Sequence, residues 1–78
     1  SPQRELVICG EKALELRNEI FSHQLPPGLI IAGTTNSESS ALTKGRLQDG
    51  HTLLYVCIDK QCHLPVLKVS EAINLLRQ

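Results

Sequence analysis

The residues with the clearest potential for chemistry are Cys57 and Cys62, which enclose four residues. Two thiols this close in sequence can act as a redox relay, and Lys60 and His63 are the positive groups nearby that favour a thiolate. The interpretation that we prefer is purely structural, with Cys57 inside a strand and Cys62 packing from a loop. Because the odd number of cysteines suits a reducing cytosol, we expect thiols here, although a disulfide across this short loop stays open. A thiol relay is kept as the alternative function.

A metal site is not expected from these cysteines. Structural zinc sites use a Cys-x-x-Cys knuckle with a second pair of ligands. The spacing of Cys57 and Cys62 differs from that pattern, and His51 and His63 do not make the second pair. The prediction for metals is therefore none.

A second group of candidates follows the apolar runs of the sequence. Ligands of parallel α/β sheets bind beyond the carboxyl ends of the strands. The possible ligand or anion contacts are therefore Gly10, Gly33, Thr34, Arg46 and Asp59. No Gly-x-Gly-x-x-Gly or Walker-type motif accompanies them, so we predict no cofactor.

Three apolar runs and two helical patterns must position these residues. The runs at 5–9, 29–32 and 52–58 predict buried strands, and 59–65 predicts a loop. Apolar spacing predicts a helix from Glu11 to about His23 and a last helix whose N-cap is Ser70. The first helix would bury Ala13, Leu14, Leu16, Ile20 and Phe21; the second would bury Val69, Ala72, Ile73 and Leu76.

This order of elements predicts the α/β class. Crossovers of this length favour a three-stranded, mostly parallel sheet of order 2-1-3 with two main helices. That arrangement is half of a doubly wound, Rossmann-like fold. The 78 residues allow a single small domain, spanning 1–78.

Composition excludes several classes of partner. Eight basic and eight acidic side chains cancel, and one Tyr, one Phe and no Trp offer no platform for bases, so we expect no nucleic acid. No apolar run approaches the roughly 20 residues of a membrane span, so we expect no membrane partner. These features, with the cysteine count, predict a cytoplasmic protein.

Both faces of the predicted sheet are apolar, and two helices are too few to cover them. One face would carry Val7, Ile30, Leu54 and Val56, which are possible interface residues. Arg17, which interrupts the apolar stripe of the first helix, is another. We therefore expect the missing layer to come from another domain of a parent protein or from a second copy. The alternative is that the segment 34–50 folds back over the sheet.

One stretch resembles a known family. Its matching residues are Gly45-Arg46, Tyr55-Val56-Cys57 and Cys62-His63-Leu64-Pro65-Val66. This pattern resembles the C-terminal end of the thioredoxin-domain-containing family typified by spermatogenesis-associated protein 20 and its bacterial relatives. In that family Tyr-Val-Cys, four residues, Cys, two residues and Pro-Val or Pro-Ile precede a last helix.

The resemblance implies that this chain is the C-terminal α/β region of a longer protein. Such a protein would carry an N-terminal thioredoxin-like domain and a central α/α toroid. The expected function is thus a non-catalytic accessory or docking domain, and we do not expect this domain alone to be an enzyme. Two alternatives stay open: the thiol relay through Cys57 and Cys62, and small-ligand binding at the strand ends.

Overall fold

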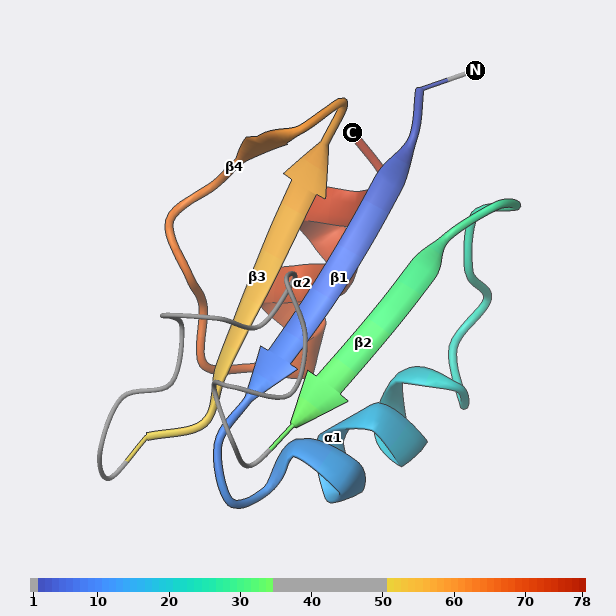
Figure 1. The fold of residues 1–78 in the computed structure, drawn as a ribbon. Coiled ribbons are helices and arrows are strands. Elements are labelled where there is room, and N and C mark those ends of the chain that lie inside the picture. Colours follow the sequence, from blue (N-terminus) through green and yellow to red (C-terminus); the bar gives the residue numbers. More distant parts are fainter. Residues whose placement is uncertain (1, 35–50) are drawn as a thin grey trace.

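The apolar runs of the sequence form the strands of a mixed sheet, and the two periodic stretches form helices on it. The computed structural model describes residues 2–34 and 51–78 (Figure 1). In these ranges the elements are β1 (Arg4–Cys9), α1 (Ala13–Ile20), β2 (Ile30–Thr34), β3 (Leu53–Ile58), β4 (Gln61–Cys62) and α2 (Val69–Leu76).

The α/β class is confirmed, but the sheet differs from the predicted one. Its strand order is β2-β1-β3-β4, so the 2-1-3 order holds and a fourth strand is added. β1 pairs with β2 in parallel, whereas β3 runs antiparallel to β1. The prediction of a mostly parallel sheet was wrong because β3 has buried residues pointing to both of its faces. Such a strand reads as a continuous apolar run whichever way it points.

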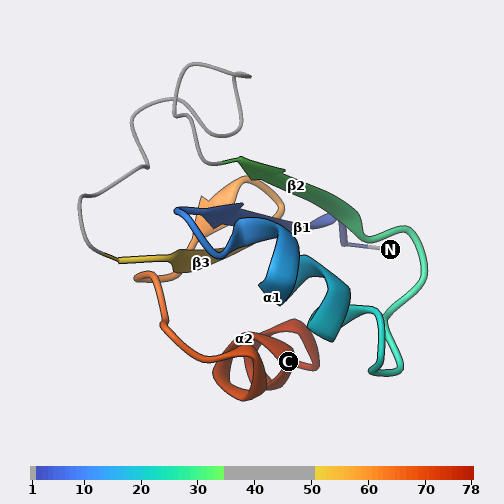
Figure 2. The same ribbon diagram turned by 90° about the horizontal axis from the view of Figure 1, so that it is seen from below.

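The main core lies between the sheet and the two helices, which cover the same face (Figure 2). Because β3 is reversed, Leu6 lies opposite Val56 and Ile8 lies opposite Leu54. These four side chains point to the helices, since alternate residues of a strand point to opposite faces. Their buried partners from the helices are Ala13, Ile20, Val69, Ala72, Ile73 and Leu76.

The helix-free face is not an open apolar surface. Val7 and Cys9 of β1 are buried there, as are Leu53 and Cys57 of β3. Ile30, at the β2 edge of this face, is 42% exposed. Of the predicted interface residues, Leu54 and Val56 are instead core residues on the opposite face, and only Val7 and Ile30 share the helix-free one.

Helix α1 is shorter than its sequence pattern predicts and buries fewer of its apolar residues. Ala13 and Ile20 are buried, but Leu14 is 70% exposed and Phe21 is 53% exposed. The sequence pattern places both in the core, and the structure corrects this. With Arg17 they form a stripe at positions i, i+3 and i+7, which lies along one flank of the helix.

Helix α2 buries the predicted face, formed by Val69, Ala72, Ile73 and Leu76. Its N-cap is Lys68 and not Ser70, which lies inside the first turn. At the other end Arg4 donates hydrogen bonds to the carbonyl oxygens of Leu76 and Gln78, each at 3.1 Å. A guanidinium at a helix C-terminus satisfies orphan carbonyls and complements the helix dipole, so Arg4 joins β1 to α2. Within the described ranges, neither helix has the length and apolar character needed to cross a membrane.

The packing of β3 predicts that Leu54→Ala lowers the free energy of unfolding by about 2–5 kcal/mol, because it empties a fully buried site. The matched control is Leu64→Ala, whose side chain is 88% exposed. This control is expected to change stability by no more than about 0.5 kcal/mol. Urea unfolding of the two variants measures the difference, and equal midpoints would contradict the burial of Leu54.

Candidate functional site

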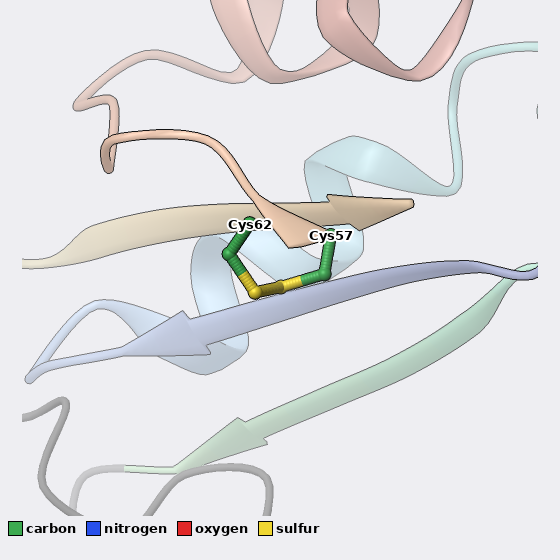
Figure 3. Close-up of a disulfide and its surroundings, with 2 residues drawn as sticks. All are labelled: Cys57 and Cys62. Atoms are coloured by element: carbon green, nitrogen blue, oxygen red, sulfur yellow. A yellow bond between two sulfur atoms is a disulfide. The ribbon is translucent and has the colours of Figure 1, made fainter. Parts of the chain in front are cut away.

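The most distinctive chemical group in the described structure is a disulfide between Cys57 and Cys62 (Figure 3). The two residues are direct register partners across β3 and β4, and their Cα atoms are 3.9 Å apart. The prediction of two thiols therefore differs from the structure. Cys57 does lie inside a strand, but Cys62 is an exposed strand residue and not a packing residue of a loop.

A two-residue turn explains why these cysteines meet. β3 and β4 are joined by Asp59 and Lys60, with φ angles of 50° and 69°. Positive φ at both central positions is the mark of the type I′ turn, whose twist matches that of an antiparallel hairpin. We call the segment from Cys57 to Cys62 the disulfide hairpin. The predicted loop at 59–65 is therefore wrong in its first part, where Asp59 and Lys60 form a turn and Gln61–Cys62 form β4.

Asp59 also anchors the start of the chain. Its carboxylate oxygen Oδ1 accepts a hydrogen bond from the Gln3 amide at 2.8 Å, and its own amide donates to the Gln3 carbonyl at 2.8 Å. These two bonds hold the turn against the residues that precede β1. Asp59 thus has a structural role in the hairpin.

The two cysteines differ sharply in exposure. Cys57 is 3% exposed on the helix-free face, where Glu5 of β1 is its register partner. Cys62 is exposed, as are Gln61 and His63 beside it. Of the two residues that the disulfide joins, only Cys62 is therefore exposed to solvent. The two ends of this bond are chemically distinct.

The predicted ligand contacts do not all come together. Gly10, Gly33 and Thr34 lie at the same end of the sheet, where β1 and β2 both end. Asp59 follows the end of antiparallel β3, which pairs Ile58 with Arg4 at the start of β1. The length of β1 separates the two ends, a distance of about 17 Å. Arg46 lies outside the described residues.

The strand end at Gly10 is filled by protein atoms. Gly10 has a φ of 139°, and a Cβ placed there would lie 2.5 Å from Thr52 Cα and 2.6 Å from the His51 carbonyl oxygen. The Lys12 amide, next to the start of α1, donates to Thr52 Oγ1 at 3.0 Å. The close backbone approach explains the glycine, and Thr52 occupies a donor that an anion would otherwise use. Sequence reasoning missed Thr52, since nothing local marks it.

Arg17 is an exposed residue that stacks on a neighbour. Its guanidinium carbon lies 4.9 Å from the centroid of the Phe21 ring, one helical turn further on. This geometry is a cation–π contact, which holds both side chains on the outer flank of α1. Arg17 thus belongs to the exposed stripe with Leu14 and Phe21, as its place in the helix periodicity indicates.

The residues that the structure describes hold no cluster of three or more His, Cys, Asp or Glu side chains suited to a metal ion. The site is therefore a disulfide between a buried and an exposed cysteine, on a small mixed α/β domain. Comparison of the chain with family models, with curated proteins and with solved structures found no match.

The turn geometry predicts that Lys60→Gly stabilises the domain. Left-handed backbone costs a residue with a Cβ roughly 1–2 kcal/mol, and the added entropy of unfolded glycine offsets about 0.5–1 kcal/mol of the gain. We expect the free energy of unfolding to rise by about 0.5–1 kcal/mol. Gln61→Gly, one residue later in β4, is the control and should lower it. Thermal unfolding of the two variants, each with its disulfide intact, measures both changes in stability. A destabilised Lys60→Gly would refute the type I′ turn.

Proposed function

We propose that this chain is a non-catalytic accessory domain that docks onto another domain of a larger parent protein. The observation that carries the proposal is the exposure of two large apolar side chains, Leu14 and Phe21, on one flank of α1, next to the terminal strand β2, whose Ile30 is also exposed. Together with Arg17 we call these three residues the edge surface. Exposed large apolar side chains that lie close together are typical of a site of protein association, and Leu14 and Phe21 lie on one flank of α1.

The three α1 residues of the edge surface, Leu14, Arg17 and Phe21, lie on the side of the helix that faces away from α2. Leu16, Glu19 and His23 of the opposite flank line a groove of about 380 Å³ together with the first residues of α2. The stripe of Leu14, Arg17 and Phe21 is rotated by more than a third of a turn from them. Since α1 packs against β2 and α2 packs against β3, that stripe points toward the β2 side of the sheet.

Strand β2 adds a second feature to this side. It is the terminal strand in the order β2-β1-β3-β4, and no described strand pairs with its outer edge. An edge strand offers backbone donors and acceptors to a partner. A neighbour that contacts both α1 and β2 would extend the sheet and the helix layer at once, which suits a domain of the same chain better than a small ligand.

The composition of the edge surface also suits docking. Phe and Arg are enriched at protein interfaces, and the Arg17 guanidinium lies over the Phe21 ring in a preformed pair. The resemblance to the thioredoxin-domain-containing family supports the same proposal, because it implies a thioredoxin-like domain and an α/α toroid in the parent. We extend the proposal to a cytoplasmic setting, in which a disulfide is most often transient and functional.

The test is binding between residues 1–78 and the remainder of the parent protein, expressed separately once the full reading frame is known. Phe21→Ala is expected to weaken binding about tenfold to a hundredfold, the equivalent of losing about 1.5–3 kcal/mol of apolar burial. Leu64→Ala, which removes a more exposed leucine outside the edge surface, should leave the affinity unchanged. Isothermal titration calorimetry provides both constants.

Three outcomes would contradict the proposal. The first is a parent without further domains, and the second is equal affinities for the two variants. The third is a dimer of residues 1–78 in sedimentation that Phe21→Ala disrupts, because a second copy would then occupy the edge surface. Circular dichroism of Phe21→Ala should match the unmodified chain, since the ring is about half exposed.

A further inference from the structure

The disulfide hairpin contains the Cys57–Cys62 disulfide, which has no part in docking through the edge surface. The disulfide joins β3 to β4 at one edge of the sheet, in the order β2-β1-β3-β4. The edge surface lies at the opposite edge, on the β2 side. One sulfur of the pair belongs to a buried residue and the other to an exposed one. A disulfide that serves only as a staple does not require this asymmetry.

We propose that Cys57 and Cys62 form a thiol–disulfide exchange site that is attacked at Cys62. A partner thiolate forms a bond to Cys62 Sγ, the bond between the two cysteine sulfurs breaks, and its electron pair leaves on Cys57 Sγ, which takes a proton from water. A second partner thiolate attacks the partner sulfur of the mixed disulfide and releases Cys62 as a thiolate. The protein disulfide gains two electrons, and the two partner thiols become a disulfide.

Access determines which sulfur is attacked. Thiolate attack is in line with the sulfur–sulfur bond, so the attacked sulfur must be open to solvent. Cys62 is an exposed residue and Cys57 is only 3% exposed, so we expect the attack at Cys62. The exposed His63 follows Cys62, and Lys60 precedes it by two residues, so positive or proton-donating groups lie close in sequence to the sulfur that is attacked.

The fold limits the consequences of reduction to a short segment. β4 has only two residues, both exposed, and its turn places Lys60 in a left-handed conformation that disfavours a side chain. Downstream, Leu54 and Val66 exchange two backbone hydrogen bonds of 2.8 and 2.9 Å, which hold the chain to β3 without the disulfide. Reduction therefore removes the covalent link between β3 and β4, while the core between the sheet and the helices stays intact.

The main experiment maps the attacked sulfur. Oxidised residues 1–78 carrying Cys9→Ala, which leaves only the two sulfurs in question, are mixed with reduced glutathione and quenched with acid. Remaining thiols are blocked with N-ethylmaleimide, and trypsin cuts after Lys60, between the two cysteines. Mass spectrometry should find glutathione on Cys62 about tenfold or more over Cys57. Equal labelling, or a preference for Cys57, would overturn the proposal.

A matched pair of variants gives an independent reading. Cys57→Ser leaves the exposed Cys62 thiol, and Cys62→Ser leaves the buried Cys57 thiol, each in the Cys9→Ala background. Toward oxidised glutathione, we expect the Cys62 thiol to react at least about ten times faster than the Cys57 thiol. Equal rates in two folded variants would count against a directed site.

The source of the partner thiol is decided by a third comparison. Reduced glutathione and a protein dithiol, reduced thioredoxin, are used at equal thiol concentrations, and the faster reductant identifies a small-molecule or a protein partner. In either case circular dichroism should show that the reduced domain stays folded and that oxidised glutathione restores the disulfide. If neither reductant acts on the folded domain, or if reduction unfolds it, the disulfide is a structural staple and the proposal fails.

Discussion

The antiparallel pairing of β3 with β1 is the constraint on which the rest of the structure depends. It brings Leu54 and Val56 opposite Ile8 and Leu6, so that two strands contribute four buried side chains to the same face. Both helices then pack on that face (Figure 2). The same reversal sends the end of β3 toward the start of β1, where the Asp59 turn bonds to Gln3 and the disulfide hairpin begins.

This arrangement separates the two candidate activities in space. The parallel unit of β1, α1 and β2 carries the edge surface, and the antiparallel unit of β3 and β4 carries the disulfide. The first has features of a docking site, with exposed apolar side chains, a cation–π pair and a terminal strand. The second has a disulfide that joins an exposed residue to a buried one. A domain that docks on one side and exchanges thiols on the other combines both proposals without conflict.

Much of the element layout could be predicted from the sequence, because dense apolar runs and helical spacing are local signals. The four buried residues of α2 follow from its periodicity alone. The direction of β3 could not be predicted, because Leu53 to Ile58 is apolar at nearly every position and so carries no preference for one face. The exposed Leu14 and Phe21 were misplaced for a related reason: periodicity reports an apolar face, not which part of it has a neighbour.

The sequence left the disulfide between Cys57 and Cys62 open and favoured thiols, because each signal for the disulfide is weak by itself. Two residues between Ile58 and Gln61 have the right length for a hairpin, but Lys60 stands where glycine is the usual residue. The count of three cysteines and the expectation of a reducing compartment then favoured thiols. Thr52 near Gly10 illustrates the same limit, since a contact between residues so far apart in the sequence has no local trace.

The direction of β3 can be tested with one added cysteine. Cys9 and Leu53 are direct register partners in the antiparallel pairing, and such partners lie within the range of Cα separations that a disulfide spans. Under mild oxidation, Leu53→Cys should therefore form a disulfide between Cys9 and the introduced cysteine, beside the existing one, as peptide mapping by mass spectrometry would show. A parallel β3 would place position 53 about 16 Å from Cys9 and bring Cys57 near it, so a link between Cys9 and Cys57 would contradict the account.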